Sequence, residues 1–333
     1  MFGFYMLKIG VIGTGSIGKN HARVCSKLPN LELVGIADKN KETLKDIARR
    51  FGVSTFTDYK ELFPKIDAVI IATPTNTHFD IATDAINAGK HILVEKPVCN
   101  SVENGKKLLS KAKDTGIVFA VGHIERHNPV VKFTKNALDN NQYGDLITLN
   151  SKRVSNFPGR IRDVGVIFDF GVHDIDVMRY ITGEVKSVYA RADRFNKQIE
   201  YEDHATIVLN FKNDLCGVIE VNWLTPIKIR KLHLTCSNKS VQADFTNQSV
   251  QTSSSSFEEV DDTNLFNTPI QNKISTVDLR KKEPLKNEIS DFVEAITKNK
   301  KPLVTGYDGL MAIKIAEAAV KSAKTGKVIR IDS

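Results

Sequence analysis

The sequence lacks the features expected of a secreted or membrane-bound protein. Its 333 residues include only four cysteines, which lie far apart and form no CxxC pair. A chain of this length needs no disulfides for stability, so we expect reduced thiols in a soluble, cytoplasmic protein. No apolar run reaches the roughly 20 residues that span a bilayer. Residues 1–18 carry neither a basic leader nor a small-residue cleavage site, so we expect no membrane partner.

A long basic block is also missing. The 47 lysines and arginines are distributed among 39 acidic residues, which gives a net charge of +8. We therefore expect no nucleic-acid partner. The same modest positive charge is compatible with an anionic small molecule such as a sugar nucleotide. The hydrophobic content of 41% is sufficient for a buried core, and the length favours two domains.

The first third of the chain alternates strand patterns with helix patterns. Nearly continuous apolar runs, typical of strands covered on both faces, occupy residues 7–13, 31–38, 68–73, 91–97 and 117–122. Amphipathic helical patterns lie between them, over residues 17–28, 41–51, 77–88 and 102–115. Gly89 and Gly116 stand at predicted helix C-caps, and Ser101 stands at a predicted N-cap. This alternation predicts an α/β Rossmann domain with a doubly wound parallel sheet over residues 1–123.

The pattern changes after residue 123, where we predict an α+β domain over residues 124–333 that binds substrate and forms oligomers. Its helical patterns cover residues 129–139, 164–181, 285–299 and 307–325, and the last two could pack back on the first domain. Its predicted strands cover residues 146–153, 205–211, 217–223, 231–237 and 328–331. The middle three are expected to be successive antiparallel strands of an open sheet, with one face on helices and one free for a partner. Residues 247–274, rich in Ser, Asn, Thr and Asp, are interpreted as a long excursion or loop.

A glycine-rich turn follows the first predicted strand and opens the first predicted helix. Gly13, Gly15 and Gly18 form a GxGxxG pattern in this strand-turn-helix context. Gly13 permits the tight turn, Gly15 lets the backbone approach a pyrophosphate, and Gly18 permits close packing of helix on strand. The helix N-terminus supplies free N–H groups and a positive dipole end. The pattern therefore predicts a dinucleotide site.

Asp38 ends the second predicted strand, twenty residues after Gly18. A carboxylate at this place accepts hydrogen bonds from the ribose hydroxyls of NAD and repels the 2′-phosphate of NADP. Lys39 weakens that repulsion. We expect NAD as the cofactor, with NADP the less favoured alternative, and an N-cap role for Asp38 is compatible with both.

Three further motifs give the chain a family resemblance. They are Ala72-Thr73-Pro74-Thr75-Asn76-Thr77-His78, Glu95-Lys96-Pro97 and Asp169-Phe170-Gly171-Val172-His173-Asp174. In this order they resemble the glucose-fructose oxidoreductase/inositol dehydrogenase/rhizopine catabolism family (Gfo/Idh/MocA) over nearly the whole chain. Residues 121–126 and 159–166 look most like the branch of UDP-N-acetylglucosamine 3-dehydrogenases and their uronate-acting relatives.

The resemblance implies a set of cofactor contacts around the nicotinamide and its ribose. Thr73, Asn76 and His78 follow the fourth strand, beyond whose carboxyl end ligands of parallel sheets bind. His78 has an ordinary alternative as a histidine at a helix start. The complete expected cofactor set is Gly13, Gly15, Ser16, Ile17, Gly18, Asp38, Lys39, Thr73, Asn76, His78, Glu95 and Lys96.

Oxidation of a sugar hydroxyl needs a proton acceptor and a positive charge beside the reacting oxygen. Lys96 leaves the fifth strand before Pro97, which by family analogy closes a cis peptide, and its charge would stabilise a developing alkoxide. His173 is our candidate base, and the reverse assignment stays open because a desolvated lysine can itself accept the proton. Asp169 shares a predicted helix face with His173, and Asp176 lies one turn further on. A salt bridge on a solvated helix face is the alternative reading of this pair.

Arginines near the predicted catalytic helix are candidates for binding a substrate diphosphate. Arg160 and Arg162 lie in a loop just ahead of it, and Arg153 lies on the preceding strand. Their forked donors match phosphate oxygens, although a solvated basic loop accounts for them equally well. The expected substrate set is Lys96, Arg153, Arg160, Arg162, Asp169 and His173.

His123 and His127 are four residues apart, but no third ligand accompanies them, so we expect no metal.

The sequence predicts an NAD(P)-dependent oxidoreductase acting on CH–OH groups, with the 3-hydroxyl of UDP-N-acetylglucosamine or a related UDP-sugar as substrate and a 3-keto sugar as product. A free cyclitol or aldose is one alternative substrate. A non-catalytic NAD-sensing regulator is an alternative of another class. The resemblance also implies a homodimer or homotetramer formed through the C-terminal sheet.

Overall fold

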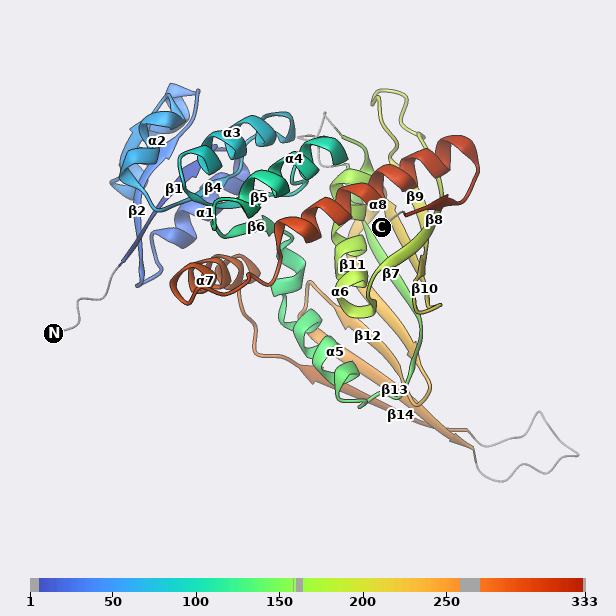
Figure 1. Ribbon diagram of the computed structural model, residues 1–333. Coiled ribbons are helices and arrows are strands. Elements are labelled where there is room, and N and C mark those ends of the chain that lie inside the picture. The colour runs from blue at the N-terminus through green and yellow to red at the C-terminus, as the bar shows by residue number, and fades with distance from the viewer. Residues whose placement is uncertain (1–5, 158, 160–163, 258–269, 332–333) are drawn as a thin grey trace, which may run out of the picture. The chain divides into compact units, whose positions relative to one another are not determined.

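The computed structural model describes residues 6–157, 159, 164–257 and 270–331 (Figure 1). The chain forms two units, which are described separately. The first contains residues 1–127 and 283–314, and the second contains residues 128–282 and 315–333. Helix α8 (Gly306–Thr325) contributes to both units. Within the described residues, no helix is both long and apolar enough to cross a membrane.

The first unit is built on a six-stranded parallel sheet with strand order β3-β2-β1-β4-β5-β6. Its strands are β1 (Leu7–Ile12), β2 (Leu31–Ala37), β3 (Ser54–Phe56), β4 (Ala68–Ile71), β5 (His91–Glu95) and β6 (Phe119–Gly122). Ile9, Ile70 and Leu93, on the three central strands, are completely buried, as strands covered on both faces require. From β1 the chain adds β2 and β3 on one side of the sheet and then β4, β5 and β6 on the other. This strand order is that of the doubly wound dinucleotide-binding fold and confirms the predicted Rossmann domain.

Helices cover this sheet at the predicted places. They are α1 (Ser16–Cys25), α2 (Lys41–Phe51), α3 (Thr75–Asn87), α4 (Val102–Lys113) and α7 (Pro284–Thr297), with short 3₁₀ helices η1 (Tyr59–Glu61), η2 (Phe63–Lys65) and η3 (Ile124–His127). Ser101 is the predicted N-cap of α4, and its side chain accepts the Asn104 N–H. Gly89 and Gly116 have the predicted positive φ, 69° and 70°, although they lie just beyond the C-cap residues Ala88 and Asp114. Helix α7 buries Leu285, Ile289 and Phe292 in the same core cluster as α1 and β1.

The second unit contains a nine-stranded sheet with strand order β14-β13-β12-β11-β7-β10-β9-β8-β15. Its strands are β7 (Leu146–Asn156), β8 (Val185–Asp193), β9 (His204–Phe211), β10 (Cys216–Asn222), β11 (Leu224–Cys236), β12 (Ser240–Asp244), β13 (Ser249–Phe257), β14 (Ile270–Asp278) and β15 (Ile329–Arg330). The predicted mostly antiparallel sheet is confirmed. Strands β9, β10 and β11 alternate in direction, as expected, but β10 and β11 are not neighbours, because β7 lies between them, parallel to β10 and antiparallel to β11.

The interpretation as a loop is wrong for residues 249–257 and 270–274, which form strands, whereas residues 258–269 lie outside the described residues. Strands β13 and β14 pair antiparallel along their whole length, and β13 also pairs with β12. Backbone hydrogen bonds hold these strands, so a sequence rich in serine and asparagine can form them where few side chains are buried. Val250, on β13, is fully buried.

Two helices of the second unit pack on one face of its sheet. Helix α5 (Pro129–Asp139) contacts β12 and β13, and helix α6 (Val172–Thr182) contacts β7 and β10. The approach of α6 is close, because a Cβ atom on Gly217 would lie 2.8 Å from Met178 Sδ. Val218 and Val208 face each other across β10 and β9 on the opposite face, since side chains alternate along a strand.

Candidate active site

The three glycines of the loop after β1 each have a distinct structural reason. Gly13 has φ of 100°, and a Cβ atom there would lie 2.5 Å from the Ala72 carbonyl oxygen. A Cβ atom on Gly18 would overlap the Gly13 carbonyl oxygen. Around a Cβ atom on Gly15, by contrast, no described heavy atom lies within 4 Å. Gly13 and Gly18 are therefore needed by the fold, whereas Gly15 keeps the loop backbone accessible.

The first turn of α1 fits a pyrophosphate. Gly15 is the N-cap of α1 and supplies no side-chain acceptor to its first N–H groups, which are the groups that bind phosphate in this fold. Ser16 and Ile17, the first two residues of the helix, are exposed. The open backbone at Gly15 and the uncapped helix end together form the cradle that a dinucleotide requires.

Asp38 follows β2 and is bonded to the glycine loop. Its Oδ2 accepts the Thr14 N–H at 2.7 Å and the Thr14 hydroxyl at 2.6 Å, and its Oδ1 accepts the Asn40 N–H at 2.8 Å. The N-cap of α2 is Asn40 rather than Asp38. Lys39 is exposed beside it. The carboxylate is thus fixed beside the loop that would hold the pyrophosphate.

His78 joins the ends of two neighbouring strands. Its Nδ1 lies 2.8 Å from the Pro97 carbonyl oxygen and its Nε2 lies 2.9 Å from the Thr73 carbonyl oxygen, and the side chain is 1% exposed. These contacts account for His78 as a buried link between the turns after β4 and β5. Asn76, in the first turn of α3, is exposed.

Lys96 directly follows β5, and its peptide bond to Pro97 is cis, as family resemblance implies. Its N–H donates to Glu95 Oε2 at 3.1 Å, and Glu95 Oε1 lies 2.7 Å from His21 Nε2. Burial raises the pKa of Glu95, but the hydrogen bond from His21 and the charges of His21 and Lys96 outweigh it, so that the net pKa lies below its ordinary value. An ionised Glu95 therefore holds the backbone of Lys96 from one side while His78 holds Pro97 from the other.

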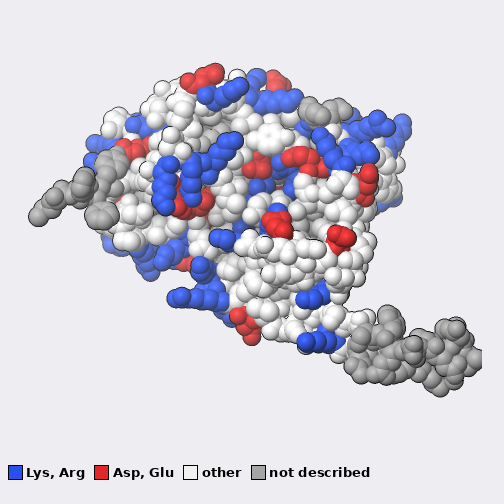
Figure 2. All heavy atoms as spheres, turned by 60° about the horizontal axis from the view of Figure 1, so that its bottom comes forward, with Lys and Arg blue, Asp and Glu red and all other residues white. Residues whose placement is uncertain are grey.

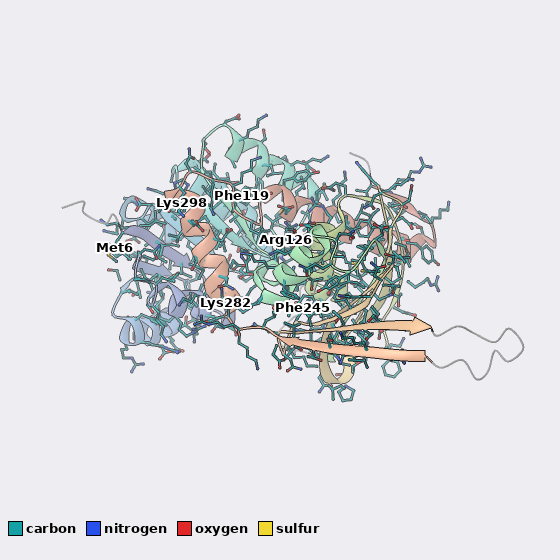
Figure 3. All side chains as sticks on the ribbon, turned by 90° about the horizontal axis from the view of Figure 1, so that it is seen from below. Met6, Phe119, Arg126, Phe245, Lys282 and Lys298 are labelled. Carbon is teal, nitrogen blue, oxygen red and sulfur yellow. The ribbon has the colours of Figure 1, made fainter. Side chains whose placement is uncertain are left out.

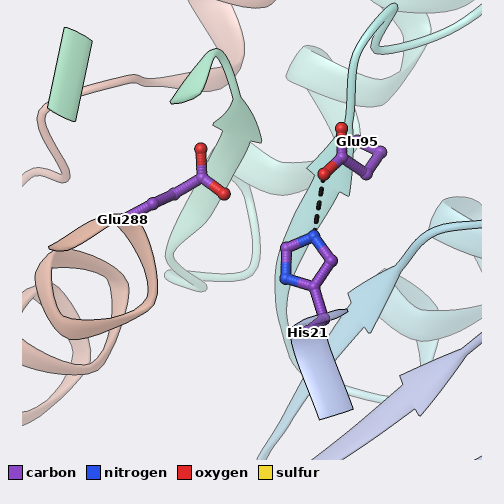
Figure 4. Close-up of side chains that lie close together, drawn as sticks. All are labelled: His21, Glu95 and Glu288. Carbon is purple, nitrogen blue, oxygen red and sulfur yellow. Dashed lines mark hydrogen bonds and ion pairs between the residues drawn. The ribbon is translucent and has the colours of Figure 1, made fainter. Parts of the chain in front are cut away.

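A third ionisable side chain lies beside His21 and Glu95 (Figure 4). Glu288, on α7, is 2% exposed, and one candidate ligand atom from each of the three residues lies within 4.8 Å of the others. Among the described residues, this is the cluster whose donor atoms could surround a cation. His123 and His127, expected to bind no metal, are both buried, and burial with the charge of Arg126 lowers the pKa of His127 to about 3. Arg126, labelled in Figure 3, pairs with Asp308 at 3.0 Å.

In the second unit, Asp169 and His173 lie at a junction of two helix types. Asp169 is in the π-helical turn η4 (Ile167–Gly171), and His173 is in the first turn of α6. π-turns of this kind are often found at functional sites. Asp169 is 6% exposed, His173 is half-buried, and Asp176 is fully buried. The pair is therefore not a solvated surface salt bridge.

Of the three candidate arginines, the structure describes Arg153. It is 1% exposed, and its Nε donates to Asp174 Oδ2 at 2.6 Å. Asp174 also accepts a hydrogen bond from the Ser151 hydroxyl. This buried ion pair ties β7 to α6, so Arg153 is occupied within its own unit. Arg160 and Arg162 lie outside the described residues.

Sequence reasoning did not single out His21 or Glu288. His21 lies one turn after Gly18 on the buried face of α1, and its signal was a polar residue among Ala22, Val24 and Cys25, which are all buried. Glu288 had a similar signal. It occupies the apolar stripe that α7 turns toward the core, together with Leu285, Ile289 and Phe292.

Charged side chains of both signs are interspersed over the face of the molecule shown in Figure 2. All four cysteines are free.

Comparison with known proteins identifies the class that this fold and loop define. Residues 7–123 match the model of an oxidoreductase family with an NAD-binding Rossmann fold, so the chain is an NAD-dependent oxidoreductase of CH–OH groups. Residues 131–242 match the GFO/IDH/MocA C-terminal domain, and the chain belongs to the GFO/IDH/MocA family.

Relatives along the full length include sugar and cyclitol dehydrogenases. UDP-N-acetylglucosamine 3-dehydrogenase of Acidithiobacillus ferrooxidans is 28% identical over 310 residues, covering 93% of this chain and 95% of the relative. Its solved structure superposes with a TM-score of 0.84 at 26% identity, covering 96% and 97% of the two chains. The scyllo-inositol 2-dehydrogenase (NAD(+)) of Bacillus subtilis is 30% identical over 346 residues, covering 98% and 97%. Oxidation of a sugar-type hydroxyl is the reaction that these relatives share.

Proposed function

We propose that this enzyme oxidises the 3-hydroxyl of UDP-N-acetylglucosamine, or of a related UDP-sugar, to a 3-keto sugar with NAD as the hydride acceptor. The observation that carries the reaction is the anchoring of Lys96 between His78 and the ionised Glu95, in the unit that holds the glycine loop. The full-length similarity to a UDP-N-acetylglucosamine 3-dehydrogenase supports the substrate.

Lys96 and His173 divide the proton chemistry in this proposal. The Lys96 ammonium stabilises negative charge on the substrate oxygen, and His173 accepts the hydroxyl proton as the hydride leaves for NAD. Asp169 orients the imidazole or binds the sugar. The alternative, in which Lys96 accepts the proton, predicts that Lys96→Arg is as inactive as Lys96→Met, because an arginine does not release its proton at neutral pH.

Substrate recognition rests on Arg160 and Arg162 as ligands of the diphosphate. Arg153 is not part of this proposal because Asp174 already binds its guanidinium. Residues 1–123 form the nucleotide-binding domain, and residues 124–333 form the domain for substrate and self-association. The four free cysteines support a cytoplasmic location.

A second candidate substrate is a free cyclitol, favoured by the 30% identity to an inositol dehydrogenase. The two candidates are distinguished by incubating the purified protein with NAD and a panel of UDP-N-acetylglucosamine, its uronate, scyllo-inositol, myo-inositol and glucose, with NADH absorbance as the readout. Turnover of the UDP-sugars and not of the free sugars is the expected result. Turnover of inositol alone contradicts the proposal, and NAD binding without turnover of any substrate favours a sensor.

A further inference from the structure

Glu288 is a buried acid for which the proposed chemistry gives no role. It lies on the core-facing side of α7 and is 2% exposed. Neither of its carboxyl oxygens has a hydrogen-bond partner among the described residues. A carboxylate in such a place is costly unless it is paired or takes up a proton.

The groups that face Glu288 determine which of these it does. Glu95 comes from β5 and His21 from α1, and Asp291 lies on α7 itself. On η3, which also contacts α7, Arg126 is paired with Asp308, and His127 has a lowered pKa. Burial first, and then the charges of Glu95 and Asp291, raise the pKa of Glu288 well above its ordinary value. Glu95 has a lowered pKa, so the two neighbouring carboxyls divide into an acid and a carboxylate.

We propose that Glu288 is a positioning residue of the active site: its carboxylic acid group donates a hydrogen bond to Glu95, after a side-chain rotation or through one bridging water, and steadies the carboxylate that accepts the Lys96 N–H. The separation of at most 4.8 Å between the cluster atoms allows either route. This inference rests on the proposed catalytic role of Lys96. It gives helix α7 a role in positioning Glu95 on β5.

A divalent cation between the three side chains is the competing explanation. Two carboxylates would balance its charge, and His21 would supply a nitrogen ligand. A cation bound by all three side chains would compete for the His21 Nε2, which already lies 2.7 Å from Glu95 Oε1, whereas a proton on Glu288 leaves that contact intact. The geometry therefore favours the proton over the metal. The two explanations predict different effects for the substitutions of Glu288.

The first test reads the proton directly. Infrared difference spectra of the full-length protein at neutral pH, wild type minus Glu288→Gln, are expected to show the carbonyl band of a protonated carboxylic acid. Glu294→Gln, a change on the exposed side of the same helix, is expected to leave that band in place. A spectrum without the band overturns the inference, and it does so whether or not Lys96 is catalytic.

The second test uses turnover. Glu288→Gln keeps a hydrogen-bond donor and is expected to retain kcat within about threefold, whereas Glu288→Met of similar size is expected to lose roughly 10- to 100-fold in kcat with the NAD Kd unchanged. Equal kcat for Glu288→Met and wild type overturns the inference. So does loss of kcat in Glu288→Gln together with loss of a stoichiometric metal found in the wild type. Full activity of Lys96→Met would instead refute the proposed function alone.

Discussion

At the residue scale, the strongest expectation concerns the side chain of Lys96. Lys96→Met keeps the length of the side chain but removes its charge, so we expect kcat to fall by roughly 10²- to 10⁴-fold. NAD affinity should change less than kcat, because the hydrogen bonds of Glu95 and His78 hold the backbone of Lys96 and Pro97 in both proteins. Steady-state kinetics with NAD fluorescence titration checks both. A variant with wild-type kcat contradicts the assigned role.

Asp38 is the residue that should select the cofactor. Asp38→Ala removes the proposed acceptor of the ribose hydroxyls and releases Thr14, so NAD should bind roughly 10- to 100-fold more weakly. Loss of the negative charge should also raise the relative affinity for NADP. Isothermal titration with both cofactors measures the ratio of the two Kd values. An unchanged ratio would show that Asp38 serves only to fix the loop through Thr14.

At the scale of elements, the glycine loop separates folding from binding. Gly18→Ala should destabilise the protein, by about 1–3 kcal/mol, because its Cβ meets the Gly13 carbonyl. Gly15→Ala has open space for its Cβ and should unfold at the wild-type denaturant concentration. It should nevertheless lose NAD affinity, since the added methyl group occupies the path of the pyrophosphate. Urea unfolding and NAD titration of both variants test this contrast between folding and binding. Wild-type NAD affinity in Gly15→Ala would contradict it.

Strand and helix existence in the first unit followed from sequence because its elements pack against sequential neighbours. Helix α2, for example, begins and ends where its pattern predicts. In the second unit, the insertion of β7 between β10 and β11 depends on pairings between distant residues, which no local pattern encodes. Strands β13 and β14 were missed because their stability comes from backbone pairing rather than from an apolar face.

The residues of the candidate site likewise divide into those with a local sequence signal and those that depend on distant packing. Lys96, Asp38 and the glycines were found because strand ends and turns leave a local signature. His21 and Glu288 meet Glu95 from opposite ends of the chain, and each alone is only a polar residue on an apolar helix face. Their meeting depends on the packing of α1 and α7 in one core, which periodicity does not specify.

At the scale of the whole molecule, buried His127 should shape acid stability. Its native pKa of about 3 lies below the ordinary value of 6.5, so the unfolded chain takes up a proton that the native chain does not. The contribution is fully present above pH 6.5 and is lost as the pH falls toward 3. His127→Gln should therefore flatten the decline, by at most about 1.4 kcal/mol per pH unit. Parallel declines in urea unfolding of wild type and variant between these pH values would contradict this account.

Self-association through the open face of the nine-stranded sheet is the last expectation at this scale. Val218 lies on β10 with Val208 beside it on β9, on the face away from α6. We propose a homodimer or homotetramer that covers this face, because paired apolar side chains in the middle of a sheet favour burial.

Val218→Asp places a charge in that position and should convert the oligomer to a monomer, because an unpaired carboxylate is costly in an interface. Sedimentation velocity over a range of concentrations measures the change. Glu220→Asp, on the same face and of unchanged charge, is the matched control and should leave the oligomer intact. Circular dichroism checks that Val218→Asp is folded. We expect it to be folded because the site is half-buried and lies away from the core. An oligomer unchanged by Val218→Asp would place the association on another surface. A wild type that is monomeric at every concentration would exclude self-association.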